Sequence, residues 1–277
     1  MVDKTTSIQK NIREYPLAVE ELALALGLIN RPDLGRNILT SAYDKLTEEQ
    51  ASERLTTASH TLLARGLCNL SKEGLPLLDK VFEEALFPLA RFDYLLQVGT
   101  IQRDVQRSMV VHVIKNRSFT SHFVQKGIIH TLENGPYTQI MDYLLDSIGS
   151  INVDEGKLGR SSLEINMELL GRAIKQRQDA GQVTSLLLGG GWPESQAKML
   201  AEDLGHQTYR DTIVRINITS NTKPEIIKDT SKPTLLILQG ATRGWVFKFS
   251  SPDDLAVGTA QIGDRKLLGK VLSSLIA

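Results

Sequence analysis

MVVHVIKNRSFTSHFVQKGIIHTL, from Met109 to Leu132, sets the fold class of this chain. It contains short runs of β-branched and aromatic residues, which favour strands: Met109–Ile114, Phe119–Gln125 and Ile128–Leu132. The segments between them, Lys115–Ser118 and the residues around Gly127, are too short for a parallel crossover, which needs about a dozen residues. The stretch therefore predicts antiparallel strands joined by hairpins.

The pattern outside this stretch alternates between helices and further strands. Apolar spacing at intervals of three and four residues predicts helices at Pro16–Leu28, Gln50–Arg65, Pro76–Ala90, Tyr137–Ile148, Ala180–Leu188, from Pro193 to Leu204, and Lys266–Ile276. Capping boxes at Thr47–Gln50 and Ser161–Glu164 predict that one of these helices and one further helix begin there. Further strands are expected at Tyr94–Ile101, Thr212–Thr219, Thr234–Gln239 and Gly244–Phe249. The sequence therefore predicts an α+β protein with a central antiparallel sheet flanked by helices.

The order of elements repeats along the chain. The strand at Tyr94 corresponds to the one at Thr212, the hairpin at Met109 to the one at Thr234, and the closing helix near Ile140 to the one near Leu267. We interpret this as two structurally related halves, 1–149 and 161–277, joined by a linker at 150–160. Their sheets would meet about a pseudo-twofold axis in one fused globular unit, which would protect the sheet edges. Chance recurrence of common elements is the alternative.

Composition excludes several classes of protein. The 277 residues carry 32 Lys and Arg against 32 Asp and Glu, so a strongly cationic surface for nucleic acid is not expected. Cys68 is the only cysteine, which excludes an internal disulfide and fits a reducing compartment. The polar N-terminus has no export signal, and no apolar run is long enough for membrane insertion. We expect a cytoplasmic protein.

No motif for chemistry is present, so we expect no catalytic, cofactor-binding or metal-binding residues and no enzyme. The Gly189–Gly191 cluster follows a predicted helix, where a phosphate loop would need a strand, and is interpreted as a helix-ending turn. His112, His122 and His130 lie in the strand region, but no carboxylate motif accompanies them as in a zinc site. We interpret them as ordinary sheet histidines, and whether they converge is left open.

A winged-helix DNA-binding regulator would show a similar order of helices followed by hairpins. Its recognition helix should be basic and should face solvent. The candidate, Pro76–Ala90, is mostly apolar and carries Lys80 together with Glu83 and Glu84. Binding to nucleic acid is therefore not expected, although this regulator is kept as an alternative.

The closing sequence GWVFKFSSPDDL…LLGKVLSSLI, together with the two related halves, carries a family resemblance. Gly244–Phe247, Pro252 and Leu267–Ile276 match a tryptophan-bearing strand followed by a leucine-rich last helix, and Leu62–Leu67 matches an earlier helix end. Over residues 15 to 276 the chain resembles the EspG family of type VII (ESX) secretion chaperones. The matching residues are of the kind that packs a core.

The resemblance implies a non-enzymatic, cofactor-free cytosolic chaperone that binds helical secretion substrates such as PE/PPE pairs and keeps them soluble. Such a protein needs an apolar groove for an amphipathic helix. We expect partner binding at Val183, Leu186, Leu187 and Trp192, beside the glycine cluster. The alternative for Trp192 is a hydrophobic staple of the following helix. A structural protein-interaction module and a homodimer also stay open.

Overall fold

The computed structural model describes residues 11–102, 105–148, 162–206, 209–218, 226–228, 233–240, 243–250 and 257–276. The chain is α+β, as predicted. It divides into two compact units, which we call the N-terminal unit (1–93 and 109–140) and the C-terminal unit (94–108 and 141–277). Residues 94–108 thus group with the later part of the chain. The linker expected at 150–160 lies outside the described residues.

The strands of the N-terminal unit are antiparallel and follow the order β1-β7-β6-β5. They are β1 (Arg13–Ala18), β5 (Val105–Ile114), β6 (Ser118–Gln125) and β7 (Ile129–Pro136), with β5 in this unit from Met109 onward. The predicted hairpins are confirmed. Lys126 and Gly127 both have positive φ, 51° and 73°, and the Ile128 N–H donates to the Gln125 carbonyl at 3.1 Å. Positive φ at both central residues is the pattern of a type I′ turn, and strand pairing begins with Gln125 opposite Ile129.

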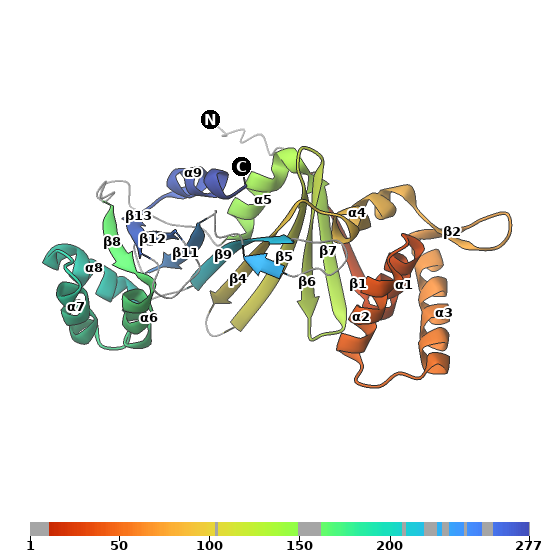
Figure 1. Ribbon diagram of the computed structural model, residues 1–277, viewed down its shortest axis with the longest axis horizontal. Coiled ribbons are helices and arrows are strands. Elements are labelled where there is room, and N and C mark those ends of the chain that lie inside the picture. Colours follow the sequence, from red (N-terminus) through yellow and green to blue (C-terminus); the bar gives the residue numbers. More distant parts are fainter. Residues whose placement is uncertain are drawn as a thin grey trace, which may run out of the picture. The chain divides into compact units, whose positions relative to one another are not determined.

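In the described part of the N-terminal unit four helices pack together (Figure 1): α1 (Val19–Leu28), α2 (Pro32–Ala42), α3 (Glu48–Ala64) and α4 (Lys80–Ala90). Their apolar faces share a core with the sheet, formed by residues such as Leu22, Leu62, Phe82 and Leu132. The capping box that opens α3 is confirmed, because the Gln50 N–H donates to Thr47 Oγ1 at 3.2 Å and the Thr47 N–H donates to Gln50 Oε1 at 3.1 Å.

Two predicted helices begin later than expected, because strands occupy their first residues. Pro16–Ala18 belong to β1, where Leu17 is buried opposite His130 of β7. Pro76–Leu78 form β3, which pairs with β2 (Cys68–Leu70) in a separate two-stranded hairpin. Helix α2 was not predicted at all. Its apolar residues are few, and Gly35 and Leu39 are its buried positions.

The strands of the C-terminal unit are also antiparallel, in the order β4-β9-β11-β12-β13-β8, with β10 paired to β9. Their bounds are β4 (Tyr94–Gln102), β8 (Leu163–Asn166), β9 (Tyr209–Ile218), β10 (Ile226–Lys228), β11 (Thr234–Gln239), β12 (Gly244–Phe249) and β13 (Val257–Ile262). Every residue of β11 is buried, as its unbroken apolar run suggests.

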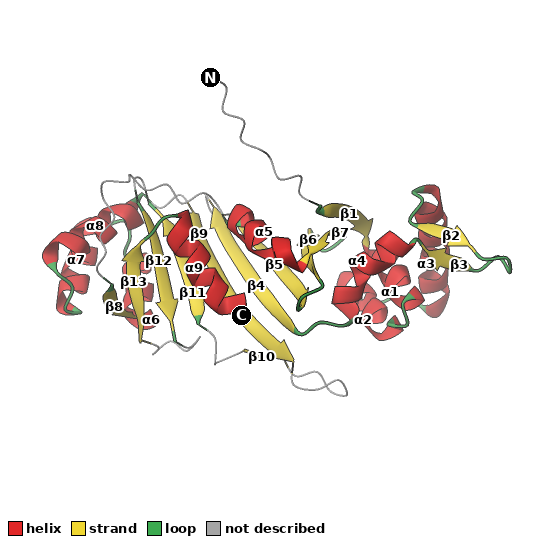
Figure 2. Ribbon diagram, turned by 90° about the horizontal axis from the view of Figure 1, so that it is seen from above, coloured by secondary structure: helices red, strands yellow, loops and turns green. Residues whose placement is uncertain are grey.

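The helices of the C-terminal unit are α5 (Ile140–Ser147), which follows a short 3₁₀ turn at Tyr137–Gln139, α6 (Met167–Lys175), α7 (Ala180–Gly189), α8 (Glu194–Gly205) and α9 (Arg265–Ile276). Helix α9 lies across one face of the strands (Figure 2), with Leu268, Leu272 and Leu275 buried. The α6–α8 group packs on a core that contains Trp245 and Phe247 of β12.

The helix predicted to begin at Ser161–Glu164 begins later in the structure, so its predicted start is wrong. Leu163–Asn166 form strand β8, which pairs with β13, and α6 begins only at Met167. Asn166 caps α6, since its Oδ1 accepts the Leu169 N–H at 2.6 Å. Pairing with the edge of β13 outweighs the local capping pattern. The pseudo-twofold relation of the halves stays a prediction.

Candidate functional site

The residues predicted for partner binding lie mostly inside the C-terminal unit. Val183 and Leu187 have 0% of their surface exposed and Trp192 has 4%, while Leu186 is partly buried against the same core. The Trp192 indole Nε1 donates to the Glu164 carbonyl at 2.8 Å, so its polar edge is satisfied within the fold. Val183, Leu187 and Trp192 therefore offer no surface to a partner in this structure.

The glycine cluster ends helix α7, as the sequence indicated. Gly191 has a φ of +84°, and the Trp192 N–H donates back to the Leu187 carbonyl at 3.0 Å. Trp192 directly precedes Pro193, the N-cap of α8, and shares its core cluster with Ala197 of that helix. This placement matches the hydrophobic staple, the alternative interpretation of Trp192. On α7 the exposed large apolar residue is Leu188, at 42%.

The hairpin of β2 and β3 carries a group of exposed leucines, which we call the apolar hairpin: Leu70, Leu75 and Leu77, exposed by 59%, 64% and 54%. It extends away from the helices of the N-terminal unit (Figures 1 and 2). Single exposed apolar residues need no explanation, but a cluster of them on a projecting element marks an interaction site or an aggregation hazard. The sequence did not reveal it, because Leu77 was assigned to the helix expected at Pro76–Ala90 and no strand was predicted between Gly66 and Pro76.

The apolar hairpin is firmly built despite its exposure. At its base Cys68 is buried and Leu78 packs against the core of the N-terminal unit. At its tip Ser71 Oγ accepts the N–H groups of Glu73 and Leu75 at 3.2 and 3.1 Å. The leucines are therefore held in a defined arrangement, which lowers the entropic cost of binding a partner.

A pocket of about 400 Å³ in the N-terminal unit is a second candidate site, and we call it the histidine pocket. Helices contribute an apolar wall with Leu26 of α1, Leu34 and Ile38 of α2, and Leu89 of α4. The sheet contributes His112, His122 and His130 from β5, β6 and β7. The three histidines thus converge, which the sequence could not establish.

Two of these imidazoles interact directly. His122 Nε2 and His130 Nδ1 lie 2.7 Å apart, and the rings stack with centroids separated by 5.0 Å. Burial lowers the pKa of His112 to about 3, with a further contribution from the nearby His122. Burial and the neighbouring His130 lower the pKa of His122 to about 4, and burial also lowers the pKa of His130. All three are therefore neutral at physiological pH.

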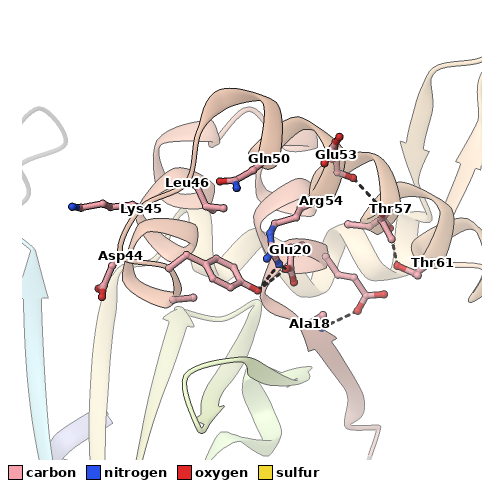
Figure 3. A pocket seen from close by; sticks show the side chains of 14 residues that line it. Ala18, Glu20, Asp44, Lys45, Leu46, Gln50, Glu53, Arg54, Thr57 and Thr61 are labelled. Atoms are coloured by element: carbon pink, nitrogen blue, oxygen red, sulfur yellow. Dashed lines mark hydrogen bonds and ion pairs between the residues drawn. The ribbon is translucent and has the colours of Figure 1, made fainter.

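A larger and more polar pocket lies between α1 and α3, with a volume of about 1,230 Å³ (Figure 3). The Glu20 carboxylate accepts hydrogen bonds from Tyr43 Oη at 2.6 Å and from Arg54 Nη1 at 2.8 Å. Burial acts to raise the pKa of Glu20, but these hydrogen bonds outweigh it and the pKa is lowered. Glu20, Tyr43 and Arg54 are hydrogen-bonded to one another, so the arrangement connects helix α1 to helix α3.

Other kinds of site are not evident in the part of the chain that the structure describes. Within the described residues, no group of three or more His, Cys, Asp or Glu side chains has an arrangement that could hold a metal ion. Over the same residues, no helix is long and apolar enough to cross a bilayer. Helix α4, the candidate recognition helix, buries Phe82, Leu86 and Leu89.

Comparison with solved structures identifies a shared fold. The chain is similar to the type VII secretion system chaperone EspG5 of Mycobacterium tuberculosis, solved in complex with a PE25–PPE41 dimer. The TM-score is 0.62 at 10% sequence identity, and the match covers 95% of this chain and 96% of the other. The protein therefore has an EspG-like fold, as the resemblance implied.

The remaining comparisons add little. No family model matches the sequence, and no curated protein matches it. The full-length peroxisomal multifunctional enzyme type 2 of Drosophila melanogaster aligns with 10% identity over 91% of this chain and 48% of that one, but at a TM-score of only 0.17. That alignment bears on neither fold nor function.

Proposed function

We propose that this protein is a non-enzymatic, protein-binding chaperone or adaptor. The observation that carries the proposal is the apolar hairpin, where Leu70, Leu75 and Leu77 are exposed on a rigid element. Exposing three leucines to water on an ordered projection is unfavourable. Burying them against a partner would lower the free energy of the complex through the hydrophobic effect. The EspG-like fold over nearly the whole chain supports the same role.

The client class follows from the structural neighbour, whose partner is a PE25–PPE41 dimer. We infer that the clients of this chain are helical, PE/PPE-like secretion substrates. Binding in the cytoplasm would keep an apolar part of the client soluble until the client is exported by type VII secretion. An amphipathic helix presents apolar residues at intervals of three and four, which suits a short row of leucines. The partner is thus a protein, and neither DNA nor a bilayer is required.

The test is direct binding to a PE/PPE-like pair from the organism that makes this protein, measured by calorimetry and by co-elution in gel filtration. We expect Leu75→Ser and Leu77→Ser together to weaken binding at least about tenfold, since about 1.5–3 kcal/mol accompanies burial of each leucine. Leu188→Ser is the matched control, because Leu188 is exposed to a similar degree on α7 of the other unit. Equal binding by all variants would exclude the hairpin as the docking element.

The alternatives predict other results. A DNA-binding regulator would be retained on nonspecific DNA in a salt-dependent way. A structural module would form a stable homodimer through the same leucines, and Leu75→Ser with Leu77→Ser would then yield a monomer without any client. If the unmodified protein binds no PE/PPE-like pair and stays monomeric, the chaperone role is wrong.

A further inference from the structure

The histidine pocket has the composition of a small-molecule site and takes no part in the proposed chaperone function. Its volume of about 400 Å³ falls within the usual range of ligand pockets, about 300–1,000 Å³. One wall is apolar and comes from helices, and the other brings a few polar atoms from the sheet. An apolar cavity with a small number of convergent polar groups is the usual form of such sites.

Two nitrogens of the histidines that line this pocket have no hydrogen-bond partner among the described residues. His130 is only 5% exposed, and its Nε2 is buried without a hydrogen bond to any described group. The same holds for His112 Nδ1. A buried polar atom left unpaired costs about 1–3 kcal/mol. Two such atoms in one pocket indicate that a bound group supplies the missing hydrogen bonds.

The direction of the His122–His130 hydrogen bond decides whether His130 Nε2 is a donor or an acceptor. If His122 Nε2 donates to His130 Nδ1, then neutral His130 carries its proton on Nε2 and offers a donor there. If His130 Nδ1 donates instead, its Nε2 is an acceptor. A ligand that presents both an acceptor and a donor oxygen therefore fits either tautomer.

The pocket contains no fixed charge that could balance an ion. None of its lining side chains is a carboxylate, an ammonium or a guanidinium. The titratable groups that face His130 are His122 and, beyond it, His112, since α1, α2 and α4 contribute only Leu, Ile, Ala, Ser and Asn side chains. A ligand anion that entered alone would be an unpaired charge among apolar groups, which is strongly unfavourable. The ligand must enter as a neutral species or together with a proton.

We propose that the histidine pocket binds a small apolar carboxylic acid, with its carboxyl group at His130 Nε2 and His112 Nδ1 and its hydrocarbon part against Leu34, Ile38 and Leu89. A carboxyl group has an O–H donor and a C=O acceptor on two oxygens, so it can pair with an imidazole nitrogen that is either an acceptor or a donor. The apolar helix wall supplies the hydrophobic part of the binding free energy.

Binding of such an acid is coupled to a proton. The free acid is a carboxylate at neutral pH, and the complex holds either the protonated acid with a neutral imidazole or a carboxylate with an imidazolium. Both forms contain one proton more than the separated reactants, so one proton is taken from solution. The association constant therefore rises about tenfold for each unit by which the pH falls near neutrality.

Decanoic acid is the probe, with 1-decanol as its uncharged counterpart. Isothermal titration calorimetry in two buffers of different ionisation enthalpy at about pH 7 measures the protons taken up. We expect about one proton per decanoate bound and none for decanol. Decanoate binding without proton uptake, or the absence of binding by both probes, would overturn the proposal.

Three variants locate the site. Ile38→Trp fills the pocket and should abolish binding of both probes. His130→Phe should weaken decanoate at least about tenfold and decanol much less, because the acid loses the imidazole that shares its proton, whereas the alcohol loses one neutral hydrogen bond. Arg36→Ala, an exposed position on the same helix outside the pocket, is the control and should change neither affinity.

NMR and the Ile38→Trp variant distinguish binding in the pocket from binding elsewhere on the surface. Imidazole NMR signals of His112 and His130 should shift with decanoate in the wild type and stay unchanged on adding decanoate to Ile38→Trp. If Ile38→Trp binds decanoate as well as the wild type does, the acid binds elsewhere on the surface and the proposal is wrong. Since these probes contain no protein client, their failure would leave the chaperone proposal untouched.

Discussion

Asp203 Oδ2 accepts the indole N–H of Trp245 at 2.8 Å in the interior of the C-terminal unit. The same oxygen accepts Arg243 Nε, also at 2.8 Å. Asp203 is 3% exposed and Trp245 is 1% exposed, so the carboxylate joins helix α8 to strand β12 at a dry point of the fold. The tryptophan of the closing motif is thus a packing residue with a buried polar anchor.

Asp203→Ala should lower the free energy of unfolding by about 3–5 kcal/mol, because it leaves the Arg243 guanidinium buried with a reduced set of partners and the Trp245 N–H without an acceptor. Chemical denaturation of the purified protein measures this change. Glu202→Ala is the matched control: Glu202 also contacts Arg243, at 3.2 Å, but its side chain is 67% exposed. Its loss should cost less than about 1 kcal/mol. Similar losses for both variants would contradict the importance of burial.

Leu187→Ala should destabilise the protein by about 2–5 kcal/mol, and Trp192→Ala by about 3–5 kcal/mol, because each leaves a cavity in the core of the C-terminal unit. Thermal and urea unfolding measure these losses. Leu188→Ala, the exposed neighbour on α7, should change stability by less than about 0.5 kcal/mol. If Trp192→Ala keeps full stability and loses only a partner, the partner-binding role first predicted for it would be restored.

The apolar hairpin should tolerate polar residues at its exposed positions. Leu75→Ser and Leu77→Ser should each change the free energy of unfolding by less than about 0.5 kcal/mol, since both side chains already lie in water. Leu78→Ser, next along the chain and packed on the core, should cost substantially more. Urea titrations of the three variants give the comparison. A large loss for Leu77→Ser would mean that this leucine stabilises the fold and is not available to a partner.

Acid should destabilise the N-terminal unit through its histidines. The pKa values of His112 and His122 are lowered from 6.5 to about 3 and about 4, so below about pH 6.5 the unfolded chain binds more protons than the folded one. The stabilising contribution is therefore complete above pH 6.5 and is lost as the pH falls towards 3–4. Unfolding titrations from pH 7.5 downward measure the slope. His112→Phe should flatten it.

The sequence predicts the strands of this protein better than the starts of its helices. The runs around Met109–Leu132 and Thr234–Phe249 are strands as expected, because β-branched residues between short polar turns have few alternatives. The capping pattern at Thr47 marks a helix start, whereas the similar one at Ser161 precedes a strand. The difference lies in the partner: β13 offers Leu163 and Ile165 an edge to pair with, which local sequence does not reveal.

The candidate sites were harder to predict than the fold. Val183, Leu187 and Trp192 look suited to a partner because large apolar residues beside glycines are common at interfaces, yet the α7–α8 pair turns them into the core. The histidines gave a weak signal. His122 of β6 lies opposite Leu132 of β7, two residues from His130, so only the pairing of these strands brings the two rings together. The leucines at 70–77 could be recognised as exposed only after the short hairpin was known.

Cys68 makes the apolar hairpin accessible to kinetic measurement. It is the only thiol of the chain, it lies 2% exposed at the base of β2, and burial raises its pKa. A buried neutral thiol reacts with labelling reagents only when the segment around it opens. The labelling rate of the unmodified protein thus reports how often the hairpin detaches from the N-terminal unit, and a client that clamps the leucines should slow that rate in proportion to its occupancy.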